Sequence, residues 1–72
     1  MYEKLCAILD ALWERGISCR AECTYCSGVW EIVCAVPIDK GMKVIRYPIT
    51  YQFMKASTAG YLISLVLKEV LN

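Results

Sequence analysis

The spacing of the apolar residues changes near residue 16, from a helical period to a strict alternation. From Ile17 to Tyr25 the odd positions are apolar or cysteine and the even positions are polar, and residues 29–36 alternate again. A period of two is typical of strands that bury one face. Ser27-Gly28, between the two runs, is a hairpin turn signal. These residues therefore predict an antiparallel hairpin at the centre of the chain.

A third alternating run covers residues 43–51, after a second turn signal at Asp39-Lys40-Gly41. Proline cannot donate a hydrogen bond to a ladder, so Pro37 is expected to end the second strand. Pro48 lies inside the third run, which marks that run as an edge strand. The predicted sheet is therefore a three-stranded antiparallel meander.

Helical spacing is found on both sides of the predicted sheet. Residues 1–15 carry one apolar stripe at positions i, i+3, i+4 and i+7, formed by Leu5, Ile8, Leu9 and Leu12. Gly16 is expected to end this helix, because glycine readily takes the positive φ of a helix C′ position. A second helix is predicted from about residue 52 to residue 71, with Thr50 or Ser57 as its N-cap.

The predicted fold is a single α+β domain over residues 1–72, a two-layer sandwich in the order α-β-β-β-α with both helices on one face of the sheet. The side chains expected on the inner, helix-facing side are Ile17, Cys19, Ala21, Cys23, Trp30, Ile32, Cys34, Val36, Ile45, Tyr47 and Ile49. The outer side is expected to carry Arg20, Glu22, Thr24, Val29, Glu31, Val33, Ala35, Val44 and Arg46. Its charged residues are placed for cross-strand ion pairs.

The composition argues against several classes of function. The net charge of +1 provides no overall attraction to nucleic acid or to acidic membranes. The chain has no histidine, the commonest general base and metal ligand, and it has no glycine-rich phosphate loop. We therefore expect a non-enzymatic protein without a cofactor. The chain has 58% hydrophobic residues, more than the usual proportion of about 45–50%. This excess either fills the core of a small domain or lies in part at a subunit or partner interface, and we expect a homodimer or another protein interface.

A reduced, cytoplasmic location is expected. Glu3, Lys4 and Asp10 occupy positions that are apolar in a signal peptide, and the five cysteines are an odd number typical of free thiols. The longest uncharged run near the C-terminus, residues 56–67, has only twelve residues, whereas a membrane helix needs about 20. No membrane partner is predicted.

Three cysteines form the one apparent chemical motif. Cys19-x3-Cys23-x2-Cys26, with Tyr25 before the last cysteine, resembles the CxxxCxxC motif of radical S-adenosylmethionine enzymes. That resemblance covers eight residues and implies that three thiolates bind a [4Fe–4S] cluster; the family's long α/β barrel is missing here. Alternatively, Cys23-x2-Cys26 has the spacing of a zinc knuckle, which Cys19 and Cys34 would complete.

The alternation favours a third interpretation, in which Cys19, Cys23 and Cys34 are buried core thiols. Residues i and i+4 of a strand are about 13 Å apart, too far to share one cluster easily. A disulfide between Cys19 and Cys34 is a further alternative. The two are directly opposite if the hairpin loop is Cys26-Ser27, whereas Ala21 is opposite Cys34 if the loop is Ser27-Gly28. Cys26, at the turn, is expected to be the most reactive thiol.

The order of elements and the length are those of the double-stranded-RNA-binding domain, which makes a nucleic-acid-binding module one alternative function. The resemblance is topological. Such domains carry a run of lysines at the second helix and a Pro- and His-containing first hairpin loop, whereas this chain has only Lys55 and the loop residues 25–28. The basic residues that would form a phosphate-binding patch are Lys40, Lys43, Arg46 and Lys55.

The preferred interpretation is a small protein-binding or regulatory module that acts through protein–protein contacts. The predicted interaction surface lies on the outer face of the sheet and contains Val29, Val33, Val44, Arg20, Glu31 and Arg46. The edge strand 43–50 offers a second way to bind, by pairing with a partner strand. Proteins this short and free of motifs are often inhibitors or accessory factors, including those of phages and mobile elements. A small metal or thiol protein is the other alternative.

Overall fold

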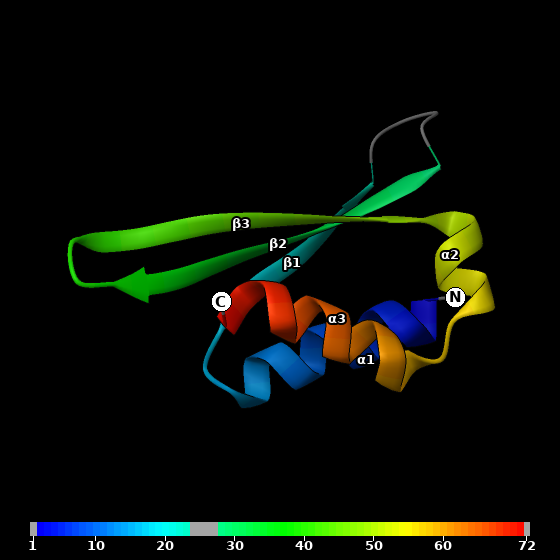
Figure 1. Ribbon diagram of the computed structural model, residues 1–72, viewed down its shortest axis with the longest axis horizontal. Coiled ribbons are helices and arrows are strands. Elements are labelled where there is room, and N and C mark those ends of the chain that lie inside the picture. Colours follow the sequence, from blue (N-terminus) through cyan, green and yellow to red (C-terminus); the bar gives the residue numbers. More distant parts are fainter. Residues whose placement is uncertain (1, 24–27, 72) are drawn as a thin grey trace.

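The computed structural model describes residues 2–23 and 28–71 (Figure 1). The elements are α1 (Tyr2–Glu14), β1 (Ser18–Cys23), β2 (Val29–Ile38), β3 (Gly41–Thr50), α2 (Tyr51–Ala56) and α3 (Ala59–Leu71). The strands form one antiparallel sheet in the order β1-β2-β3. Helices α1 and α3 lie together against one face of this sheet (Figure 1). The predicted α+β sandwich with an antiparallel meander is confirmed.

The end of α1 shows why the chain changes period at residue 16. The Gly16 N–H donates to the Trp13 carbonyl at 2.9 Å, and the Ile17 N–H donates to the Leu12 carbonyl at 3.0 Å. With Gly16 at φ 76°, this is a Schellman motif, and the side chains of Leu12 and Ile17 on either side of it are both buried in the core. The predicted helix end at Gly16 is therefore confirmed, and the chain enters β1 directly.

One backbone hydrogen bond defines the alternation of the β2–β3 ladder. The Tyr51 N–H donates to the Gly28 carbonyl at 2.8 Å, and these two residues continue the register in which Thr50 lies opposite Val29. Antiparallel pairs alternate between hydrogen-bonded and non-hydrogen-bonded positions. Odd-numbered residues of β3 and even-numbered residues of β2 therefore hydrogen-bond to each other. The backbone N–H and C=O groups of odd-numbered β2 residues point toward β1, and those of even-numbered β3 residues point to the open edge of the sheet.

This alternation explains both prolines. Pro48 occupies an even position of β3, so the N–H it lacks would have pointed to the open edge of the sheet. The expectation that Pro37 ends the second strand is wrong, because β2 continues to Ile38. Pro37 occupies an odd position of β2, and β1 pairs no farther than Ala35. The missing N–H of Pro37 therefore breaks no hydrogen bond.

The last predicted helix is divided into α2 and α3 by Ser57 and Thr58. Thr50 is the N-cap of α2, as predicted, since its hydroxyl oxygen accepts from the Phe53 N–H at 3.1 Å. Thr58 caps α3 in the same way, since its hydroxyl oxygen accepts from the Tyr61 N–H at 3.2 Å. Ser57, the alternative expected cap, lies at the C-cap of α2 with extended backbone angles.

Lys4 of α1 holds this break in place. Its ammonium group donates to the carbonyls of Met54, Lys55 and Ser57 at 2.9, 3.1 and 2.6 Å. These carbonyls lie at the end of α2, where a helix has unsatisfied acceptors and the negative end of its dipole. A side chain at the start of the chain therefore caps a helix fifty residues later.

The core lies between the sheet and the two longer helices. Its buried residues are Leu5, Ile8, Leu12, Ile17, Ile32, Cys34, Ile49, Met54, Leu62, Val66 and Val70. The predicted inner-face residues lie in this cluster or pack against it, with one exception. Cys23 is exposed, because it is the last residue of β1, at an end of the sheet that projects away from the helices (Figure 1).

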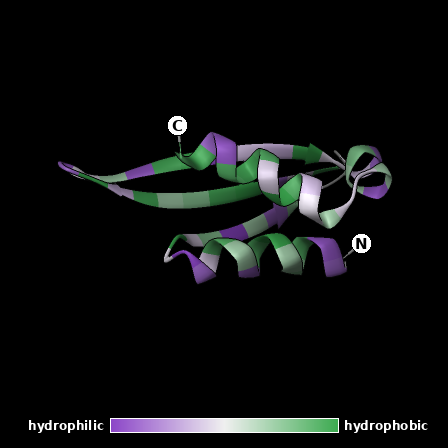
Figure 2. Cartoon of the chain, turned by 60° about the horizontal axis from the view of Figure 1, so that its bottom comes forward, coloured by the Kyte–Doolittle hydropathy of each residue, from purple (hydrophilic) through white to green (hydrophobic). Residues whose placement is uncertain are grey.

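The hairpin formed by β2 and β3 is longer than the rest of the sheet. Pairing with β1 ends at the row Ser18–Ala35, but β2 and β3 continue to pair as far as Ile38 and Gly41. Figure 2 shows this part of the hairpin extending past the helical layer. We refer to residues 36–44 as the arm.

Candidate functional site

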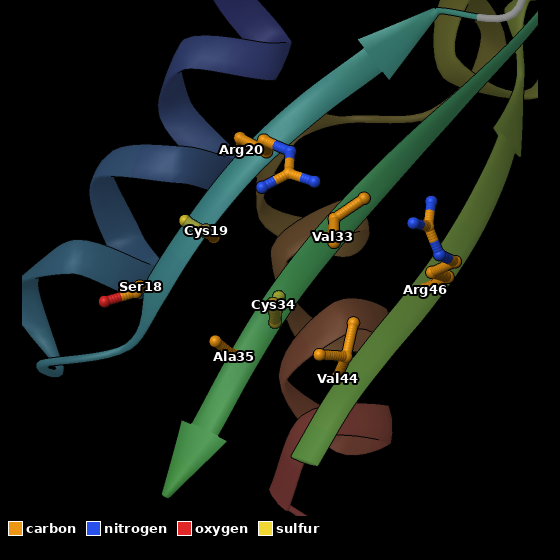
Figure 3. A pocket seen from close by; sticks show the side chains of 8 residues that line it. All are labelled: Ser18, Cys19, Arg20, Val33, Cys34, Ala35, Val44 and Arg46. Atoms are coloured by element: carbon orange, nitrogen blue, oxygen red, sulfur yellow. The ribbon is translucent and has the colours of Figure 1, made fainter. Parts of the chain in front are cut away.

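The outer face of the sheet contains a shallow hollow of about 340 Å³. Two rows of residues across the three strands form most of it (Figure 3). The residues of these rows are Arg20, Val33 and Arg46 in one and Ser18, Ala35 and Val44 in the other. The hollow thus has an apolar floor on the central strand and an arginine on each side.

An ion-pair network closes one end of this hollow. Glu22 Oε1 lies 2.8 Å from Arg20 Nε, and Glu22 Oε2 lies 3.4 Å from Arg46 Nη1. Arg46 Nη1 also lies 3.7 Å from Glu31 Oε1. The predicted cross-strand ion pairs are confirmed. Since two arginines face two glutamates, this part of the surface carries no net charge that would select an ionic ligand.

The network also changes the character of the predicted interaction surface. Val33 is only 5% exposed although it lies on the face without helices, and its neighbours in the ladder are Arg20 on β1 and Arg46 on β3. Val29 is half-buried. Val44, by contrast, is 60% exposed. Of the three valines in that prediction, only Val44 therefore presents a large apolar surface.

Hydrogen bonding within the network lowers the pKa of the Glu22 carboxyl below its ordinary value of 4.5. The hydrogen bond from Arg20 is the largest cause, and Arg46 adds to it by hydrogen bonding and by its charge. Glu22 therefore stays ionised at neutral pH, and it does not act as a proton donor there.

Two further apolar side chains in the arm are exposed. Met42 is 57% exposed and shares its face of β3 with Val44, so it extends the surface around that residue. Ile38 on β2 is 51% exposed but has the parity of Cys34 and Val36, so it lies on the opposite face of the arm. Neither residue is among those that the sequence predicts for the interaction surface. Met42 has the same parity as Val44 and was detectable from the alternation, whereas Ile38 was excluded by the expected strand end at Pro37.

The outer edge of β3 has no neighbouring strand among the described residues, as predicted for an edge strand. Because odd positions of β3 bond to β2, the N–H groups of Met42, Val44 and Arg46 point to this open edge. The register is continuous from Gly41 to Thr50, so no bulge twists the edge away. The edge can therefore accept another extended chain.

Exposed aromatic side chains lie at the other end of β3. They are Tyr51 and Phe53 of α2 and Tyr61 of α3, and the rings of Phe53 and Tyr61 are 6.2 Å apart. Trp13 of α1 is exposed as well, but its indole N–H donates to the Cys19 carbonyl at 3.2 Å. Trp30 packs against the core, as expected from its parity.

The structure brings two of the motif cysteines together. Cys19 of β1 lies directly opposite Cys34 of β2, on the inner face of the sheet. Cys34 is completely buried, and the half-buried Cys19 thiol donates to the Leu9 carbonyl at 3.6 Å. Burial raises the pKa of Cys19 to about 11, with a smaller contribution from Cys34, and burial also raises the pKa of Cys34.

The other cysteines do not join this pair. Cys23 is exposed at the end of β1, Cys6 is exposed on α1, and Cys26 lies outside the described residues. Among residues 2–23 and 28–71, no three potential metal ligands gather at one point. The interpretation as core thiols therefore holds for Cys34 and Cys19, which lie in the core or pack against it. It does not hold for Cys23, which is exposed.

The predicted basic patch is not assembled as one surface. Lys40 lies in the turn at the tip of the arm and Lys43 near the start of β3, whereas Lys55 lies in α2, beyond the other end of that strand. Thr50 lies seven positions after Lys43 along β3, which corresponds to about 23 Å. Arg46, between them, is paired with Glu22 and Glu31.

No protein family model matches this chain, and neither a curated protein nor a solved structure matches it. None of the described helices has the length and apolar character needed to cross a lipid bilayer. The function is therefore inferred from the chemistry of the surface.

Proposed function

We propose that this protein is a non-enzymatic protein-binding module with a regulatory role, and that it binds an extended segment of its partner along the edge of β3. The observation that carries this proposal is the row of outward N–H groups at Met42, Val44 and Arg46, on a strand edge without a bulge. Such an edge binds a partner strand through main-chain hydrogen bonds.

The side chains along this edge supply an apolar contact. Val44 and Met42 lie on the same face of β3, and both are more than half exposed. Val44 also borders the hollow whose floor is formed by Val33 and Ala35. An apolar side chain of the added strand would pack there, next to Arg46, whose charge is already compensated. We therefore expect an aliphatic or aromatic partner residue beside Val44.

Pro48 limits where the partner pairs. At its position in β3 a backbone N–H would point to the open edge, but proline has no N–H to donate to a partner strand. Pairing is therefore expected over residues 41–47 and not over the end of β3 that precedes α2. Residues 41–47 include Met42 and Val44, two exposed apolar residues of the arm.

A proline substitution tests the main-chain part of this proposal. Val44→Pro removes one outward N–H at the same kind of position that Pro48 already occupies, so the β2–β3 ladder is retained. Val44→Ala is the matched control, because it shortens the side chain and keeps the N–H. In affinity capture from the source cells, we expect Val44→Ala to retain less of the partner than the wild type does and Val44→Pro to retain none.

A second pair of variants separates this surface from exposed apolar residues in general. Val44→Lys places a charge beside the edge, whereas Leu71→Lys places one at the end of α3, where the side chain is 71% exposed. Loss of the partner with Val44→Lys but not with Leu71→Lys supports the proposal. Equal retention by all four variants would exclude the β3 edge as the binding surface.

The first partner to examine is a second copy of this chain. Two β3 edges paired about a two-fold axis at Val44 would place Val44 against its equivalent and Met42 against Arg46 of the other copy. A solution mass of two chains for the wild type and one chain for Val44→Pro is the result expected of a homodimer. A single-chain mass for the wild type at high concentration would restrict the proposal to other protein partners.

A further inference from the structure

The cysteine pair on the inner face has a particular position in the ladder. Cys19 lies directly opposite Cys34. The hydrogen bond from Tyr51 to Gly28 shows that even residues of β2 bond to β3, so the N–H of Cys34 points away from β1. Cys19 and Cys34 therefore form a non-hydrogen-bonded pair of the β1–β2 ladder.

This is the position at which two cross-strand side chains approach most closely. Residues in a non-hydrogen-bonded pair have Cα atoms about 4.5 Å apart. A disulfide requires a Cα separation of roughly 4.4–6.8 Å, so these cysteines are within bonding range without a shift of the strands. Both side chains point to the same face, where they contact the core.

We propose that Cys19 and Cys34 are a redox-active pair that forms a reversible intramolecular disulfide by exchange with a small disulfide such as glutathione disulfide. The separation is close to the lower limit for a disulfide, and bonds with such constrained geometry are reduced more easily than relaxed ones. The pair therefore belongs with switchable disulfides and not with permanent structural ones.

The accessibility of the two thiols sets the order of the steps. Cys19 is half-buried and Cys34 is completely buried, so the Cys19 thiolate attacks the small disulfide first. A mixed disulfide forms on Cys19 and one small thiol leaves. Cys34 then loses its proton and attacks Sγ of Cys19, and the second small thiol leaves. Two protein thiols are oxidised and one small disulfide is reduced to two thiols.

Oxidation changes the contacts of β1. In the reduced protein the Cys19 thiol donates to the Leu9 carbonyl of α1 at 3.6 Å, and the disulfide has no proton for this bond. The new bond also ties β1, which has only six residues, to the central strand. The raised pKa of Cys19 makes the exchange slow at neutral pH and faster as the pH rises, since only the thiolate attacks.

A variant with only these two cysteines tests the proposal. Cys6→Ser, Cys23→Ser and Cys26→Ser together leave Cys19 and Cys34 as the only thiols. After incubation with glutathione disulfide at pH 9, we expect the intact chain to lose two hydrogens and to keep no glutathione. Trypsin cleaves after Arg20, so the bond is identified by a product that links residues 16–20 to residues 21–40.

The same sample tests whether the disulfide stabilises the fold and whether its formation is reversible. A loop of about 15 residues closed by a disulfide is expected to raise Tm by about 5 °C or more, and excess dithiothreitol should reverse this shift. The matched control adds Cys34→Ala to the triple variant. Its Cys19 should stop at the mixed disulfide with glutathione, because no second thiol can displace it.

Two results would overturn the proposal. One is a folded triple variant that retains a stable glutathione adduct or stays fully reduced at pH 9. The other is oxidation that yields only disulfide-linked dimers. If the triple variant does not fold, the wild-type protein is oxidised and digested in the same way, and the absence of a link between residues 16–20 and Cys34 then decides against the proposal.

Discussion

Arg46 of β3 and Glu22 of β1 form an ion pair that crosses the central strand, with Arg46 Nη1 3.4 Å from Glu22 Oε2. Arg20 and Arg46 flank Val33 in the ladder, and Val33 is 5% exposed. The middle of the outer face therefore presents little apolar surface. The apolar surface that remains open lies in the arm, next to the β3 edge.

This network predicts a specific dependence of stability on pH. The folded protein holds the pKa of Glu22 below 4.5, so the ionised carboxylate stabilises the fold above that pH, and the contribution is lost as the pH falls toward the lowered pKa. Glu22→Gln is expected to be less stable than the wild type at pH 7. Urea unfolding from pH 7 to pH 3 should show the two curves converging below pH 4.5, and a constant difference would contradict the assignment.

The bonds of Lys4 predict a large effect for an apparently ordinary surface lysine. Lys4→Met keeps the aliphatic stem but leaves the carbonyls of Met54, Lys55 and Ser57 without their charged donor. We expect a loss of about 1–2 kcal/mol in the free energy of unfolding, measured by urea denaturation. Lys40→Met, in the exposed β2–β3 turn, is the control and should change stability by less than about 0.5 kcal/mol. Equal effects of the two substitutions would show that the Lys4 cap contributes nothing.

Two leucines of α3 provide a matched test of the core. Leu62 is fully buried between the helices and the sheet, whereas Leu71 at the end of the same helix is 71% exposed. Leu62→Ala is expected to lower the free energy of unfolding by about 2–5 kcal/mol, because it leaves a cavity in a small core. Leu71→Ala should cost under about 0.5 kcal/mol. Circular dichroism during thermal unfolding of both variants would compare them directly.

The raised pKa of Cys19 predicts a loss of stability in alkaline solution. The folded state keeps this thiol protonated up to about pH 11, whereas its ordinary pKa is 9.0. Its contribution is therefore complete below pH 9.0 and is lost as the pH rises toward about 11. Compared with Cys19→Ala, the reduced wild type should lose more stability across that interval. Parallel pH profiles of the two proteins would show that the thiol is not desolvated.

The alternation and the helical stripes contain enough information for the fold class. Leu5, Ile8 and Leu12 recur once per helical turn, and all three are buried as the spacing predicts. Ile32 and Cys34 share parity on β2 and both lie in the core. These patterns are local, and burial of one face of each element leaves few ways to arrange two helices and a meander.

Local rules were insufficient where a distant part of the chain decides the outcome. Proline predicts a strand end at Pro37, but its effect depends on the β1–β2 ladder, which reaches no farther along β2 than Ala35 and leaves the backbone nitrogen of Pro37 without a neighbour to bond. The break before α3 depends in part on Lys4, which stabilises the end of α2 from α1. The exposure of Cys23 follows from where the helical layer stops.

Periodicity along the chain thus determined the element types, their order and most of the inward faces, because each depends on side-chain spacing within one segment. The pairing register was decided only in three dimensions. Two hairpin registers were open in the sequence, and the observed one places Cys19 opposite Cys34. Register depends on contacts among β1, β2 and the helices packed on them, and a slip of one residue would turn every buried side chain of a strand to the outer face.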